Sequence, residues 1–141
     1  KVSVSTDQYS GIKISTTKAV AIDKTKKLTD SLRKVEKRSG EYVYTLTLAD
    51  SHLADYVVYC TGTESSFCVV MFNDSTSLKL QDRTKIECRR GRVSSYYILN
   101  PTLADVFKTK QVLEIRLAAE VFLRDYQIKK PEKIQELFNS L

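Results

Sequence analysis

The stretch GEYVYTLTLAD, residues 40–50, carries the clearest structural signal of this chain. Large apolar side chains occupy every second position from Tyr42 to Leu48, and valine and threonine occupy the positions between them. Because successive side chains of a β-strand point to opposite faces, this period of two in β-favouring residues predicts a half-buried strand. The Ser39-Gly40 pair in front of it is a turn signal, so residues 31–37 are predicted to form the preceding strand.

Similar alternation continues on both sides of this segment. Further strands are expected within residues 11–22, 67–72, 77–82, 84–90, 93–99, 111–117 and 121–128. The lysine-rich residues 23–30 are expected to form a loop or an edge segment. The chain therefore reads mainly as short strands joined by turns.

Residues 102–128 can be interpreted in two ways. The first interpretation is one helical turn followed by two strands. The inward positions of the turn would be Leu103, Val106 and Phe107. One face of the first strand would carry Leu113, Ile115 and Leu117. The alternative is a continuous helix, because an Ala-Ala-Glu run in the middle of the segment favours helix.

The C-terminal residues 131–141 have the period of a helix. Pro131 suits the first helical position, because the N–H that proline lacks would have no partner there. An apolar stripe follows at helical spacing and comprises Ile134, Leu137, Phe138 and Leu141. We expect this helix to pack on the sheet through that stripe.

These segments together predict an α+β, mostly β domain. The strands are expected to form an antiparallel sheet, or a sandwich or barrel-like body, that the C-terminal helix closes. The 141 residues have the length of one domain, 1–141, which can bury enough surface to fold without a metal or a disulfide. Residues 1–8 are either a short leading strand through Val2 and Val4 or a flexible leader. No apolar run approaches the roughly 20 residues of a membrane-spanning helix, so no membrane span is expected.

Two cysteines flank a polar loop in YVVYCTGTESSFCVVMF, residues 56–72. If the two apolar halves form a hairpin centred on Glu64, nearly every opposed pair is apolar and Cys60 lies opposite Cys68. Opposed residues of an antiparallel pair lie within the distance that a disulfide tolerates. In an oxidising compartment the sequence therefore predicts a Cys60–Cys68 disulfide and a free, buried Cys88. In a reducing compartment all three would be small apolar residues of the core.

The sequence does not indicate a catalytic, metal or cofactor site. The cysteine spacing lacks the close pairs of zinc sites, and no glycine-rich phosphate loop or zinc-protease motif occurs. His52, the only histidine, lies near Asp50 and Asp55, but residues that are neighbours in sequence rarely form a catalytic set. We therefore expect no enzyme activity, no metal and no cofactor. An activity that uses His52 with either aspartate is the alternative.

The net charge of +6 favours anionic partners. Basic clusters occur around Lys24, around Arg33 and at RRGR, residues 89–92, which is also a predicted turn. The candidate polyanion-binding residues of this turn are Arg89, Arg90 and Arg92. Tyr96 and Tyr97 follow on the next strand, and arginine beside exposed aromatic rings is typical of single-strand nucleic-acid binders. Charged edge strands that resist pairing with other chains are the alternative interpretation.

The second half of the chain has a recognisable order of segments. It contains YYIL, a short TLADVFK segment, VLEIRL, RDYQI and a closing KKPEKIQELFNSL. This order resembles the C-terminal pattern of small uncharacterised bacterial β-rich proteins, often exported, that end in an amphipathic helix. The opening DQYSGIKI is similar to the start of such proteins. The resemblance implies an exported β-rich domain of unknown activity, assigns no functional residue and does not account for the cysteines.

The expected function is that of a non-enzymatic binding or structural module whose partner is a protein or an envelope component. The alternative is a nucleic-acid or polyanion-binding domain that uses the basic turn. An extracytoplasmic or secreted location is expected, with a cytoplasmic one as the alternative. The chain begins at Lys1 without a methionine, which a cleaved secretory signal or a trimmed domain would explain.

Overall fold

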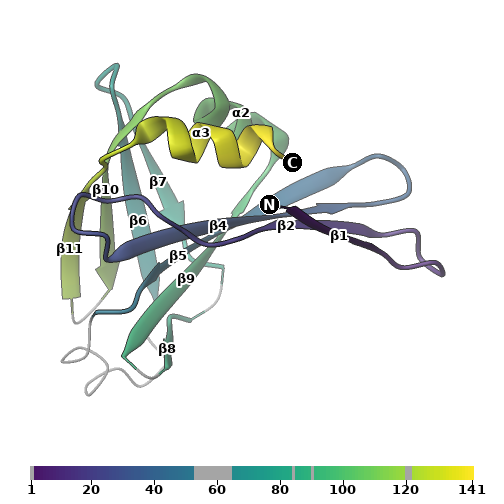
Figure 1. The fold of residues 1–141 in the computed structure, drawn as a ribbon, viewed down its shortest axis with the longest axis horizontal. Coiled ribbons are helices and arrows are strands. Elements are labelled where there is room, and N and C mark those ends of the chain that lie inside the picture. The colour runs from purple at the N-terminus through teal and green to yellow at the C-terminus, as the bar shows by residue number, and fades with distance from the viewer. Residues whose placement is uncertain (1, 53–64, 84, 90, 120–121) are drawn as a thin grey trace.

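The computed structural model describes residues 2–52, 65–83, 85–89, 91–119 and 122–141, which form two antiparallel β-sheets and two helices (Figure 1). The larger sheet has seven strands in the order β1-β2-β4-β5-β9-β8, and β3 pairs with β4. Its strands are β1 (Val2–Thr6), β2 (Lys13–Thr17), β3 (Val20–Ala21), β4 (Leu28–Glu36), β5 (Tyr42–Asp50), β8 (Glu87–Arg89) and β9 (Arg92–Leu99).

The smaller sheet has four strands in the order β11-β10-β6-β7. Its strands are β6 (Ser66–Phe72), β7 (Ser77–Gln81), β10 (Val112–Ala119) and β11 (Phe122–Gln127). The two helices are α2 (Pro101–Thr109) and α3 (Pro131–Asn139). The predicted class, an antiparallel and mostly β α+β fold with a C-terminal helix, is confirmed.

The strand predicted from residues 40–50 is β5, which lies inside the larger sheet between β4 and β9. Leu46 pairs with Leu32 of β4 on one side and with Tyr97 of β9 on the other. All three side chains are buried in the core, whereas Thr45 and Thr47 of β5 are half-buried. The period of two in the sequence thus divides this sheet into a core face and an outer face.

Both helices lie across one end of the two sheets (Figure 1) and share one apolar core with them. Phe107 of α2 stacks on Phe138 of α3, with ring centroids 4.9 Å apart. The predicted apolar stripe of α3 is buried at Ile134, Leu137 and Phe138. α2 begins after Asn100, whose side chain accepts the Leu103 N–H at 2.8 Å, and it is longer than the single turn predicted for residues 102–107.

The structure corrects the predictions for residues 102–128 and decides between the two interpretations of the first residues of the chain. The continuous helix over residues 102–128 is wrong, because β10 and β11 form a strand pair there. Leu113 does not share a buried face with Ile115, because a bulge between Val112 and Glu114 turns its side chain outward, where it is 47% exposed. Of the two interpretations of residues 1–8, the structure supports the short leading strand over Val2–Thr6, because this strand, β1, pairs with β2. Within the described residues, neither helix is long and apolar enough to cross a membrane.

The predicted hairpin between the two halves of residues 56–72 is wrong for its second half. That half is β6, and both of its edges are already paired, one with β7 and one with β10. Cys68 therefore lies opposite Leu80 on one side and Leu117 on the other. The first half, residues 56–61, lies outside the described residues.

Candidate functional site

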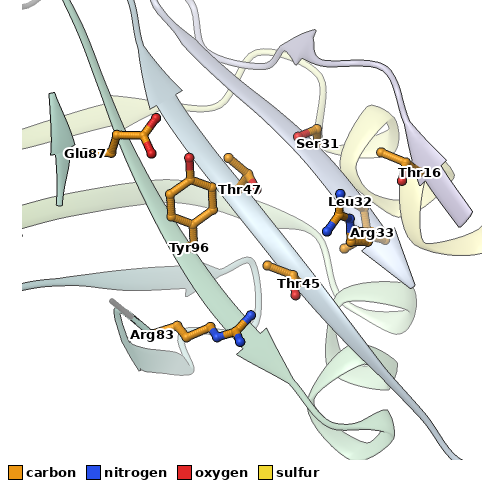
Figure 2. Close-up of a pocket in the computed structure, with 9 residues that line it drawn as sticks. All are labelled: Thr16, Ser31, Leu32, Arg33, Thr45, Thr47, Arg83, Glu87 and Tyr96. Carbon is orange, nitrogen blue, oxygen red and sulfur yellow. The ribbon is translucent and has the colours of Figure 1, made fainter. Parts of the chain in front are cut away.

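The outer face of the larger sheet, which points away from the core, carries two adjoining depressions. The first measures about 440 Å³ and is lined by Thr16, Ser31, Leu32, Arg33, Thr45, Thr47, Arg83, Glu87 and Tyr96 (Figure 2). The second measures about 460 Å³ and is lined by Ser51, Glu87, Arg89, Arg92, Ser94 and Tyr96. Glu87 and Tyr96 belong to both depressions, so the two form one continuous surface, which we call the outer-face site.

Strand register explains why hydroxyl groups collect here. Two cross-strand rows run over the outer face, Thr16–Arg33–Thr45 and Ser31–Thr47–Tyr96. Directly opposed residues of antiparallel strands lie on the same face and close together, so each row brings three polar side chains side by side. The alternation that places leucine and tyrosine in the core thus places threonine and serine in the site.

Hydrogen bonds fix Arg83 beside Tyr96. β8 pairs with residues Arg92–Ser94 of β9. The segment that precedes β8 in the sequence lies beside the next part of β9, at Tyr96. There the Asp82 carboxylate accepts the Tyr96 N–H at 3.1 Å, and the Arg83 N–H donates to the Tyr96 carbonyl at 2.7 Å. Ser66 anchors Asp82 by donating from its hydroxyl at 2.7 Å. Figure 2 shows the result, with Tyr96 between Arg83 and Glu87.

The tight turn between β8 and β9 brings two arginines together. Arg89 and Arg92 are directly opposed, as expected for strands joined by two residues. Gly91 in that turn has φ +78°, a left-handed conformation that glycine adopts without steric cost. Both arginines line the second depression.

The outer-face site has an excess of positive charge. Four exposed arginines line it, Arg33, Arg83, Arg89 and Arg92, against one carboxylate, Glu87. In the described part of the chain, none of the four guanidinium groups forms an ion pair or a hydrogen bond with a side chain. Burial, followed by the neighbouring Glu87 carboxylate, raises the pKa of the Tyr96 hydroxyl. This hydroxyl is protonated at neutral pH, as tyrosine ordinarily is, and Glu87 is beside it as a hydrogen-bond acceptor.

The predicted basic turn is part of this site, but two of its expected members differ. Arg89 and Arg92 lie together in the second depression, while Arg90 lies outside the described residues. Tyr96 is half-buried in the site, but Tyr97 faces the opposite way, fully buried, and donates to the Ser95 hydroxyl at 2.9 Å. The expected pair of exposed aromatic rings is therefore absent from this strand.

Sequence reasoning named a basic cluster around Arg33, but it did not connect Arg33 or Arg83 with the basic turn. Arg83 precedes β8 and Arg33 belongs to β4, so only the pairing of β4, β5 and β9 brings them to one surface. One signal was available in Thr45 and Thr47, which form the polar face of the predicted central strand. Polar residues on a strand inside a sheet mark a face that the core does not cover.

The cysteines differ from the prediction. Cys68 is a free, buried thiol, so the predicted Cys60–Cys68 disulfide is wrong. Cys88, which was expected to be free, is disulfide-bonded and lies on β8 between Glu87 and Arg89. Cys60 lies outside the described residues. The bonded cysteine therefore belongs to the strand that carries part of the outer-face site.

The alternative site around His52 is not assembled as a catalytic set in the described residues. The exposed His52 donates its backbone N–H to Asp50 Oδ1 at 2.7 Å. Asp50 Oδ2 accepts the Tyr126 hydroxyl at 2.6 Å, so both carboxylate oxygens have structural partners. Asp55 lies outside the described residues.

Known proteins do not identify the outer-face site. Comparisons with protein-family models, with curated protein sequences and with solved structures find no match for this chain. Among the described residues, no group of three or more His, Cys, Asp or Glu side chains could hold a metal ion. The functional conclusion therefore depends on the outer-face site itself.

Proposed function

We propose that this protein is a non-enzymatic binding module that holds an anionic partner on the outer-face site. One observation carries this proposal: two adjoining depressions share Glu87 and Tyr96 and are lined by four arginines that form no ion pair with another described residue. A site with this excess of positive charge attracts anions, and guanidinium groups bind carboxylate, sulfate or phosphate with two parallel hydrogen bonds.

The chemistry of the site supports binding rather than catalysis. The Tyr96 hydroxyl is protonated at neutral pH, as tyrosine ordinarily is, and burial and the Glu87 carboxylate raise its pKa further, so it is not a nucleophilic phenolate. The threonine and serine hydroxyls of the two cross-strand rows are further donors and acceptors. These groups hold a ligand by charge and hydrogen bonds without breaking a bond in it.

We also propose an exported location. Disulfides persist in oxidising compartments and are rare in the cytosol, and Cys88 is disulfide-bonded. This bond supports the same location that the resemblance to exported bacterial β-rich proteins implies. An anionic partner outside the cytoplasm would be an envelope or extracellular polymer.

The proposed function is tested by reversing charge inside and outside the site. The double variant Arg89→Glu/Arg92→Glu removes the opposed pair, and Lys24→Glu/Lys27→Glu makes the same change of net charge away from both depressions. Binding of each protein to a heparin oligosaccharide and to single-stranded DNA is measured by titration at several salt concentrations. The logarithm of the wild-type affinity is expected to fall linearly with the logarithm of salt concentration.

The arginine variant is expected to bind at least about tenfold more weakly and, for DNA, with a salt slope lower by roughly 1.4. The lysine variant is expected to bind nearly as well as wild type. Equal losses in the two variants would mean that net charge alone attracts the polyanions, and the outer-face site would then not be the binding site. Circular dichroism of both variants checks that the fold is retained.

A further inference from the structure

We propose that the ligand of the outer-face site is a linear acidic glycan, held by its anionic groups at the arginines and by its sugar hydroxyls at the threonines and Glu87. This inference builds on the proposed anion-binding function and names the class of anion. The ligand is a saccharide chain, and binding of nucleic acid instead is the competing outcome of the experiments below.

The first support is the number of hydroxyl groups between the charges. Thr45 and Thr47 lie on the strand inside the site, and Thr16 and Ser31 extend the same rows toward the sheet edge. A hydroxyl both donates and accepts, so it pairs with a sugar hydroxyl in either direction. Phosphate and sulfate oxygens only accept, so a surface for a bare polyanion would gain more from further lysine or arginine at these positions.

The second support is Glu87, which lies where the two depressions meet. Its strand places it directly opposite Ser94 and two residues from Arg89. An ionised carboxylate only accepts hydrogen bonds, which suits a sugar hydroxyl. Its charge repels any anion, so a ligand must present a hydroxyl at Glu87 and keep its anionic groups at the arginines. A carboxylate shared by two depressions that four arginines line therefore favours a ligand that alternates hydroxyl donors with negative charges.

The third support is the arrangement of the aromatic rings. Proteins that bind single-stranded nucleic acid stack successive bases on exposed rings beside a basic groove. Of the two tyrosines on β9, Tyr97 is fully buried in the core and only Tyr96 reaches the outer-face site, where it is half-buried. The described residues thus provide one ring and many hydroxyls in this site, which favours sugars over bases.

The fourth support is the shape of the site. The two depressions adjoin at Glu87 and Tyr96, so a ligand that fills both must be a chain of more than one unit. The guanidinium groups are divided between them, with Arg33 and Arg83 in the first and Arg89 and Arg92 in the second. Each depression therefore offers cations to an acidic sugar, and the threonine and serine hydroxyls of the two cross-strand rows line the first depression.

The first experiment compares ligands that separate charge from hydroxyls. Isothermal titration calorimetry on the wild-type protein uses an oligogalacturonate, its methyl ester, a heparin hexasaccharide, a polyphosphate and single-stranded DNA, with the anionic probes matched in charge. We expect at least one of the two acidic saccharides to bind about tenfold more tightly than polyphosphate or DNA, and the neutral ester not to bind. The comparison of oligogalacturonate with heparin decides between carboxylated and sulfated sugars.

The second experiment uses variants that are expected to change glycan affinity and polyphosphate affinity differently. Glu87→Gln removes a charge that repels phosphate and a strong acceptor for sugar hydroxyls, so glycan affinity should fall about tenfold while polyphosphate affinity rises. Thr45→Val/Thr47→Val keeps side-chain shape and strand preference, and should weaken glycan binding alone. Thr6→Val on the exposed strand β1 is the matched control and should change neither affinity.

The outcomes distinguish the two proposals. If polyphosphate and DNA bind as tightly as the saccharides, and Glu87→Gln raises every affinity, the glycan inference is overturned while the anion-binding function stands. If no anionic probe binds, both proposals fail. If glycan binding survives the Arg89→Glu/Arg92→Glu change, the glycan does not bind at the outer-face site.

Discussion

The hydroxyl of Tyr126 donates a hydrogen bond of 2.6 Å to Asp50 Oδ2, and this bond links the edge strand of the smaller sheet to the end of β5 in the larger one. Asp50 is only 1% exposed, and its Oδ1 accepts the His52 N–H. A carboxylate is tolerated at such depth when its oxygens have hydrogen-bond partners. The pair therefore joins the two sheets through a buried hydrogen bond.

Replacing Tyr126 by phenylalanine should destabilise the protein. Asp50 Oδ2 would lose its donor while staying buried, at a cost of about 1–3 kcal/mol in the free energy of unfolding. Urea unfolding followed by circular dichroism measures this change. Tyr9→Phe is the control, because Tyr9 is 87% exposed and should tolerate the loss of its hydroxyl. Equal midpoints for wild type and Tyr126→Phe would show that the bond contributes nothing.

Asp30 should make the protein less stable as pH rises. It lies on the core face of β4, and within the described residues its Oδ1 has no hydrogen-bond partner. Burial raises the pKa of this carboxyl from 3.8 to about 8. Between these two values the folded protein holds a proton that the unfolded chain releases, so stability falls by up to about 1.4 kcal/mol per pH unit and levels off above the folded pKa.

The Asp30→Asn variant tests this pH dependence. Asparagine does not ionise, so the variant should lose less stability than wild type between about pH 5 and pH 8. The measurement is urea unfolding across that range. Asp74→Asn is the control: Lys110 and Thr76 lower the pKa of the exposed Asp74, so its contribution changes only at acidic pH. Parallel pH profiles for wild type and Asp30→Asn would contradict the prediction.

The cysteines should show one protected thiol and one disulfide. Burial raises the pKa of the Cys68 thiol to about 12, so the folded protein should resist alkylation at neutral pH. After unfolding without reductant, one thiol should be labelled, at Cys68. Peptide mapping should then find Cys88 unlabelled and in a disulfide-linked peptide. Three labelled thiols, or a label on Cys88, would contradict the disulfide and the exported location together.

The cap of α2 should contribute measurably to stability. Asn100 accepts the Leu103 N–H, so Asn100→Ala should lower the free energy of unfolding by about 1 kcal/mol. The chain offers a matched control in Lys130, which occupies the same position before α3 and makes no side-chain cap. Lys130→Ala should therefore change stability little, and thermal unfolding of both variants makes the comparison. Similar losses in the two variants would mean that the hydrogen bond is not the cause.

The fold was predictable wherever one face of a segment is apolar. The alternation in residues 40–50 fixed which side of β5 enters the core, and the stripe through Ile134 and Phe138 fixed α3. The hairpin of residues 56–72 failed for a physical reason. β6 has apolar residues on both faces, so its pattern does not specify which strands lie beside it. The bulge in β10 could likewise not be recognised in the sequence, because Leu113, Ile115 and Leu117 alternate as in a regular strand and therefore predicted an inward Leu113.

The outer-face site was predictable only in part. Arg89 and Arg92 are close in sequence and flank a glycine turn, so local reasoning placed them together. Arg33 and Arg83 reach the same surface through the pairing of strands that lie far apart along the chain, which one sequence does not determine. The direction of Tyr97 follows from strand parity once the core face is known, since it lies opposite Leu46.

The sheet order also has a kinetic consequence. β5 pairs with β9, Asp50 lying opposite Val93, and β6 pairs with β10, Phe72 lying opposite Val112. Each pairing joins residues that lie far apart in the sequence. The chain therefore loses conformational entropy by closing a long loop before the strand contacts form and compensate for this loss. Folding is therefore expected on the millisecond-to-second timescale of non-local β-proteins. The β4–β5 hairpin needs only its short turn, and it is expected to supply the early template onto which β9 is added.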